Sequence, residues 1–189
     1  PMAQLTQTWR TLATSVAFGA AAATAFAQAT MAPVNDAPNP YTTVENHFKL
    51  PEGRVWGSTS AVDIDPDGKS IWVAERCGAN GCWDRAKSQM TPLPVILKFD
   101  ESGKLVRSFG TGIAVFPHGI HVDKDGNVWI ADFAGNKAGD RGHQVHKFSP
   151  KGEKLLSLGI AGKPGNADGQ FNQPNDVVTG PDGSIYVSD

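Results

Sequence analysis

The chain has 189 residues, a formal net charge of −2 and 40% hydrophobic residues. This near-neutral balance, without any basic cluster, argues against a nucleic acid or another polyanion as partner. The 21 glycines and 13 prolines are typical of an all-β protein rich in turns.

Residues 1–27 have the pattern of a secretory signal peptide. Arg10 precedes an apolar run from 12 to 26, and Ala25-Phe26-Ala27 forms an A-x-A cleavage pattern. An uncleaved anchor or an alanine-rich helix is less favoured, because the run is short for a membrane span. We therefore expect a secreted or periplasmic protein without membrane attachment after cleavage, and a flexible lead-in over 28–40.

Residues 41–50 alternate apolar and polar side chains, which predicts a strand. Three hairpins of one kind follow, each with two short apolar runs around an Asp-Gly turn that accepts positive φ. The hairpins lie at 62–75, 116–133 and 176–189. Their turn glycines Gly68, Gly126 and Gly183 are 58 and 57 residues apart, which identifies an internal repeat.

A second repeat is interleaved with the first, because residues 95–105 resemble residues 144–155. One unit therefore holds four short strands, which is typical of a propeller blade. We expect blades at about 55–110 and 111–160 and a partial blade at 161–189.

Residues 41–189 thus form an incomplete β-propeller of about two and a half blades. A ring needs ~4–8 blades to close, so we expect a fragment of a longer protein. In the closed ring, the strand at 41–50 would pair with the last blade.

Two cysteines, Cys77 and Cys82, lie in the loop that follows the first hairpin. In an exported chain they are most simply a disulfide that staples the loop. A zinc half-site is less favoured, because the sequence has no second cysteine pair to complete it.

Three acids, Glu75, Asp132 and Asp189, end equivalent strands of the three hairpins. Such acids are expected to accept hydrogen bonds from turn amides and to hold neighbouring blades together. Arg76 follows the first of them, and is either a surface arginine or one that faces the central channel.

His118 lies just before a strand expected to face the channel. Three imidazoles from different blades could hold one zinc and leave a position open for substrate, although one histidine alone is a weak signal. Alternation along the strand places His121 on the opposite face, and His143 and His146 flank a different strand.

The segments FPHGIHVDKDGNVWIADF, HQVHKFSPKGEKLLSLG and FNQPNDVVTGPDGSIYVSD closely resemble the peptidylglycine α-amidating lyase family, from about Gly57 to Asp189. The resemblance implies an NHL-repeat propeller with six blades in the full-length protein. It also implies an exported zinc-dependent lyase that cleaves the C–N bond of a peptidyl-α-hydroxyglycine into an amide and glyoxylate. We expect a peptide or small-molecule substrate and a monomer.

The resemblance further implies roles for individual residues. His118 matches a zinc ligand and Arg76 a catalytic arginine, while the backbone carbonyls of Val62 and Ile120 match ligands of a structural calcium. In the family, the catalytic tyrosine and two more zinc histidines come after the position of Asp189, so residues 28–189 alone are expected to be inactive. The cysteine loop replaces the family's H-R-G surroundings.

Two other functions stay open on the sequence. One is a non-catalytic NHL propeller that binds a ligand or a protein through one face. The other is a calcium-dependent lactonase-type propeller, for which Asp63, Asn175 and Asp176 are available but no clear ligand set is visible.

Overall fold

The structure is a computed structural model that describes residues 37–189. The predicted signal peptide and most of the predicted lead-in lie outside the described residues. All strands of the described residues belong to the compact second unit, residues 43–189. No helix among the described residues has the length and apolar character that a membrane crossing requires.

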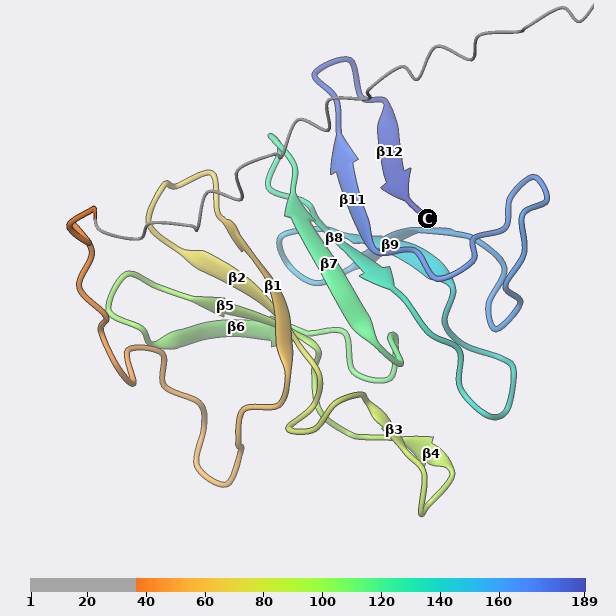
Figure 1. The fold of residues 1–189 in the computed structure, drawn as a ribbon, viewed down its shortest axis with the longest axis horizontal. Coiled ribbons are helices and arrows are strands. Elements are labelled where there is room, and N and C mark those ends of the chain that lie inside the picture. The colour runs from red at the N-terminus through yellow and green to blue at the C-terminus, as the bar shows by residue number, and fades with distance from the viewer. Residues whose placement is uncertain (1–36) are drawn as a thin grey trace, which may run out of the picture. The chain divides into compact units, whose positions relative to one another are not determined.

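The second unit contains two four-stranded antiparallel sheets and two separate two-stranded hairpins, as Figure 1 shows. The first sheet has the order β1(Thr59–Ile64), β2(Ile71–Glu75), β5(Ile96–Phe99), β6(Leu105–Phe109). The second has the order β7(Pro117–Val122), β8(Val128–Asp132), β9(Gln144–Phe148), β10(Lys154–Leu158). The third hairpin pairs β11(Asp176–Thr179) with β12(Ile185–Ser188), and the small hairpin β3(Trp83–Asp84), β4(Gln89–Met90) is inserted between β2 and β5. The predicted all-β fold built from propeller blades is confirmed.

The hairpin turns form where the Asp-Gly pairs predict them. Gly68 has a φ of 72° and Gly126 a φ of 80°, values that glycine adopts without steric cost. Each turn is closed by a backbone bond, from Gly68 N to the Asp65 carbonyl and from Gly126 N to the Asp123 carbonyl. These local turns fix the register of β1 with β2 and of β7 with β8.

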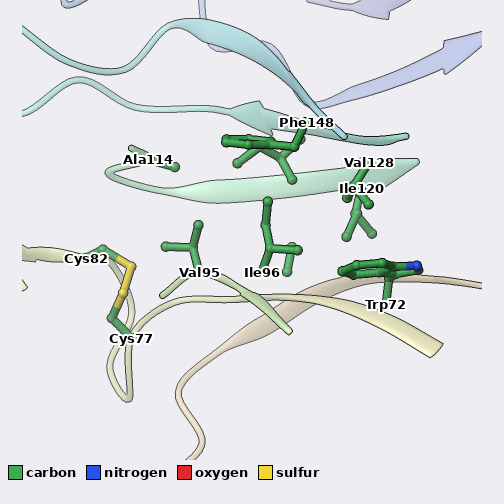
Figure 2. Close-up of a cluster of buried hydrophobic side chains, with 11 residues drawn as sticks. Trp72, Cys77, Cys82, Val95, Ile96, Ala114, Ile120, Val128 and Phe148 are labelled. Carbon is green, nitrogen blue, oxygen red and sulfur yellow. A yellow bond between two sulfur atoms is a disulfide. The ribbon is translucent and has the colours of Figure 1, made fainter. Parts of the chain in front are cut away.

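A buried cluster joins the two complete blades (Figure 2). The rings of Trp72, Phe109 and Phe148 form a chain across the two sheets, with centroids 5.6 and 5.4 Å apart. Burying each large side chain contributes roughly 1.5–3 kcal/mol. The blades therefore hold each other through apolar packing.

The first strands of successive blades, β1, β7 and β11, run next to one another (Figure 1). The Ser60 hydroxyl of β1 donates to the His118 carbonyl of β7 at 2.7 Å. On the other side of β7, a Cβ on Gly119 would collide with Asp176 of β11. The glycine of the P-H-G motif thus permits close approach of the third hairpin.

The prediction of a strand at residues 41–50 is wrong. The segment forms only an isolated parallel bridge between Lys49 and Lys104, and Val44 is 68% exposed. Alternation specifies a strand only where a sheet edge is available for pairing, whereas Phe48 and Leu50 here pack as separate side chains against the cluster around Phe99.

Candidate functional site

The strand-end acids bind backbone amides, as the sequence predicts. Asp132 accepts from Phe116 N at 2.7 Å and from Val115 N at 3.0 Å, and Asp189 accepts from Asn172 N at 2.6 Å. In each case the amide belongs to the loop that enters the same blade. The expectation that these acids link neighbouring blades is therefore wrong, because each acid stabilises the loop that leads into its own blade.

Glu75 plays this part in the first blade. It accepts from Gly57 N at 2.7 Å, in the loop before β1, and from Gly78 N at 2.8 Å, in the loop after β2. Arg54 forms an ion pair with it, and both side chains are almost fully buried. The end of β2 is thus tied to both adjoining loops.

Arg76 is buried, so the interpretation as a surface arginine is wrong. Its Nε donates to the Pro117 carbonyl at 2.9 Å and its Nη1 to Asn80 Oδ1 at 2.9 Å. The guanidinium lies 3.6 Å from the centroid of the Phe116 ring, a cation–π contact. Burial lowers the pKa of Arg76, and no carboxylate within residues 37–189 forms an ion pair with it.

His118 is the second residue of β7, and not the residue before the strand. Its ring stacks on Phe133 with 5.1 Å between centroids and lies 6.4 Å from the Phe116 centroid. Its Nδ1 is 3.1 Å from the Asn175 carbonyl oxygen. Since a carbonyl only accepts, Nδ1 carries the proton and Nε2 is left with a lone pair.

Arg76 and His118 are therefore brought to one place. Both contact Phe116, one by its guanidinium and the other by its imidazole. The Pro117 carbonyl that Arg76 binds directly precedes His118 in the chain. A cation and an imidazole that are 42 positions apart in the sequence thus share one aromatic neighbour.

Three further histidines make different contacts. His121 lies between blades, 2.9 Å from Thr179 Oγ1 and 3.5 Å from Asp63 Oδ2. His143 accepts from the Gln173 amide at 3.3 Å, and desolvation lowers its pKa. His146 lies inside β9, 2.8 Å from Ser157 Oγ, where burial lowers its pKa to about 4.

The predicted disulfide between Cys77 and Cys82 is present (Figure 2). Both half-cystines are buried at the edge of the cluster between the blades. The Cys82 amide donates to the Val115 carbonyl at 2.7 Å. The stapled loop of the first blade is thereby fastened to the segment that enters the second.

A pocket of ≈ 750 Å³ lies between this loop and the loop that follows β8. It is lined by Asn80, Trp83, Arg85, Phe116, Asn136 and Lys137, among others. Phe116 thus belongs both to the pocket lining and to the arrangement with Arg76 and His118. The sequence did not predict this pocket. The one related signal in the sequence is that two loops are longer than a propeller repeat requires.

Val62 and Ile120, expected to offer carbonyls to calcium, occupy corresponding positions on the adjacent strands β1 and β7. No three histidine, cysteine, aspartate or glutamate side chains within residues 37–189 lie close enough together to hold a metal.

The three residues considered for a lactonase-type calcium site form side-chain hydrogen bonds with backbone groups. Asp63 accepts from Val122 N at 2.7 Å and Asp176 from Val177 N at 2.9 Å, while the Asn175 amide group donates to the Gln173 carbonyl at 3.3 Å. These contacts explain the three side chains structurally.

No protein-family model matches the chain. It is 29% identical over 138 residues to the probable peptidyl-α-hydroxyglycine α-amidating lyase pgal-1 of Caenorhabditis elegans, covering 72% of this chain and 33% of that protein. It is 31% identical over 144 residues to peptidyl-glycine α-amidating monooxygenase A of Xenopus laevis, covering 70% of this chain and 15% of that protein.

A third relative is named only for its repeats. NHL repeat-containing protein 3 of Homo sapiens is 30% identical over 138 residues, covering 70% of this chain and 35% of that protein. The chain spans about a third of the length of the C. elegans and human relatives. Over 70–72% of its length the chain is therefore similar to proteins named for peptide α-amidation and to a protein named for NHL repeats.

Proposed function

We propose that the protein is a lyase of the amidating class, which converts a peptidyl-α-hydroxyglycine into a peptide amide and glyoxylate. This proposal is based mainly on the positions of buried Arg76 and of His118, which both lie next to the ring of Phe116. The name of the C. elegans relative, an α-amidating lyase, supports the reaction class.

His118 suits a zinc ligand by its hydrogen bonding. Metal-binding histidines commonly donate the second ring N–H to a carbonyl or carboxylate, which fixes the ring and its tautomer. The Asn175 carbonyl receives this bond from Nδ1, and Nε2 forms no hydrogen bond with the described residues. When bound, zinc would supply Lewis acidity toward the substrate hydroxyl, together with further ligands that the family resemblance places after Asp189.

Arg76 suits the binding of an anionic substrate group. A buried charge without a charged partner is costly, and among residues 37–189 Arg76 contacts a carbonyl, an amide oxygen and an aromatic face but pairs with no carboxylate. The carboxylate of the hydroxyglycine would supply the missing charge. Arg76 would thus orient the reacting end of the substrate beside His118.

The reaction is balanced without a redox step. A base takes the proton of the substrate hydroxyl, the C–O bond becomes the aldehyde carbonyl of glyoxylate, and the C–N electron pair leaves with nitrogen. Protonation of that nitrogen completes the amide. The family resemblance assigns the base to a tyrosine that follows Asp189.

Structural calcium and export complete the proposal. The strands that carry Val62 and Ile120 run side by side, so one ion bound through their carbonyls would link two blades. Oxygen ligands of this kind suit calcium. The Cys77–Cys82 disulfide supports a secreted or periplasmic protein.

The test uses the full-length protein, His118→Ala and the matched control His47→Ala. We expect stoichiometric zinc and glyoxylate release from an α-hydroxyglycine peptide in the parent and in the control. In His118→Ala, zinc content should fall well below one equivalent and glyoxylate release should be lost. Equal zinc content in all three proteins would refute the role of His118.

The second candidate is a non-catalytic NHL propeller, favoured by the human relative that is named only for its repeats. This alternative predicts no glyoxylate release at any zinc concentration. It also predicts that any sequence after Asp189 lacks the tyrosine and the two histidines that the family resemblance implies.

A further inference from the structure

The pocket beside Phe116 has a one-sided charge. Two cations line it, Arg85 from the loop inserted in the first blade and Lys137 from the loop after β8. Both are exposed, and neither forms an ion pair with any residue in the described part of the chain. No acidic residue of that part lines the pocket.

The acids in the two surrounding loops already have partners. Asp84 pairs with Lys87 at 3.6 Å, and Asp140 accepts from the Asn136 side chain at 2.7 Å. Neither carboxylate forms an ion pair with Arg85 or Lys137 in the described part of the chain, so an anion that enters the pocket meets two unpaired cations.

The pocket also offers apolar surface and peptide-binding groups. Trp83 and Phe116 supply aromatic faces, and Asn80 and Asn136 supply amide groups. Its volume of ≈ 750 Å³ is within the ~300–1,000 Å³ of small-ligand sites, which is enough for a short stretch of peptide.

The position of the pocket relates it to the proposed reaction. Phe116 is part of the pocket lining, and the Arg76 guanidinium lies 3.6 Å from the centroid of its ring. Asn80, also in the lining, accepts a hydrogen bond from Arg76 at 2.9 Å. A peptide held at Arg76 by its terminal carboxylate would therefore extend its preceding residues along this pocket.

We infer that the pocket selects peptides with an acidic side chain immediately before the α-hydroxyglycine. Arg85 and Lys137 would attract that carboxylate, and Trp83 would cover its aliphatic part. This inference rests on the proposed lyase function, because that function places the reacting end of the peptide at Arg76.

The experiment compares three peptides that differ only in the residue before the α-hydroxyglycine, which is Glu, Gln or Lys. KM and kcat for glyoxylate release are measured with the full-length protein at low and high salt. We expect a KM about fivefold lower for Glu than for Gln, the size that partly exposed charge pairs allow, and a higher KM for Lys. The Glu preference should shrink in high salt.

Two double variants with the same charge change make the test specific. In Arg85→Gln/Lys137→Gln the Glu-to-Gln ratio of KM should approach one. In Arg107→Gln/Lys151→Gln, whose residues are exposed and outside the pocket lining, the ratio should equal that of the parent. Equal KM for Glu and Gln in the parent, or a preference that survives Arg85→Gln/Lys137→Gln, would overturn the inference.

Failure of the lyase function is recognised separately, because then none of the peptides releases glyoxylate. Calorimetric titration with the same three peptides still decides the pocket. Tighter binding of the Glu peptide that is lost in Arg85→Gln/Lys137→Gln supports it, and equal affinities refute it.

Discussion

The two complete blades are built alike on their sheets and differently at their ends. In the first, the Trp72 indole N–H donates to Asp65 at 2.8 Å, and the Lys98 ammonium lies 2.6 Å from the same carboxylate. The second repeats this arrangement with Trp129, Asp123 and Lys147, at 3.0 and 3.3 Å. The repeat therefore preserves a three-residue network along with its strands.

The acids at the ends of β2 and β8 differ in their partners. Glu75 is ion-paired with Arg54, whereas the donors to Asp132 in the described part of the chain are two backbone amides. Burial outweighs those amides and raises the pKa of Asp132 to about 7. The two sheets thus repeat the same strands and the same network, while the acids at the ends of β2 and β8 differ in the partners that bind them.

The largest expected effect is on the ion pair of the first blade. Arg54→Met leaves the buried Glu75 carboxylate without its cation, which should cost about 3–5 kcal/mol of unfolding free energy. Urea unfolding measures this loss. Arg54→Met/Glu75→Gln should recover a large part of it, and a double variant as unstable as Arg54→Met would show that the lost arginine packing, rather than the charge, is responsible.

The second blade should show two opposed pH dependences. His146 has a lowered pKa, about 4, so its neutral form stabilises the fold above pH 6.5 and this stability is lost as pH falls through 4. The shift corresponds to ~3 kcal/mol. Asp132 has a raised pKa, so its contribution is full below the ordinary Asp range and is lost as pH rises through 7.

Single substitutions separate the two groups. In Asp132→Asn, the free energy of unfolding should rise from pH 4 to pH 6.5, because the contribution of His146 is no longer opposed by that of Asp132. In His146→Leu this rise should be lost, because the opposing contribution of Asp132 remains. Urea titrations at several pH values measure both slopes, and identical profiles in the two variants would contradict this assignment.

The disulfide gives the first blade a constraint that the described part of the second lacks. Cys77→Ser/Cys82→Ser should lower the free energy of unfolding by about 2 kcal/mol, as loop-closure entropy gives for so short a loop. Thermal unfolding of the oxidised parent and the variant measures it. An unchanged midpoint would mean that the Cys82–Val115 backbone bond already holds the loop.

The sequence predicts those parts of the fold that local chemistry determines. The turns at Gly68 and Gly126 could be predicted because the ability to adopt positive φ is a property of a single residue. The Cys77–Cys82 disulfide could be predicted because both cysteines lie in one short loop. The segment 41–50 fails because alternation alone does not show whether a partner strand exists.

The candidate site depends on contacts distant in sequence. The burial of Arg76 follows from Pro117 and Phe116, about 40 positions away, and the carbonyl that accepts the orienting hydrogen bond of His118 belongs to Asn175, 57 positions away. Arg76 and His118 could be proposed from family resemblance, but their common neighbour Phe116 and the adjoining pocket required the folded chain.

The smallest expected effect tests whether the two Trp-Asp-Lys networks are energetically equal. Although desolvation raises the pKa of Asp123, the bonds from Trp129, Asn127 and Lys147 outweigh it and lower the pKa to about 2. This carboxylate therefore stabilises the fold above about pH 4, and the stability is lost as pH falls through 2. Trp129→Phe removes the indole donor and should cost ~1–2 kcal/mol near neutral pH.

The acid-unfolding midpoint should also move to higher pH in Trp129→Phe, because the pKa of Asp123 rises. Trp72→Phe is the matched variant in the first blade, where the corresponding Asp65 side chain is more exposed, at 13% against 7% for Asp123. We therefore expect a smaller shift of the midpoint in Trp72→Phe. Equal shifts would mean that the repeat preserves the strength of the network as well as its geometry, and no shift in Trp129→Phe would mean that the indole bond does not hold the Asp123 carboxylate ionised.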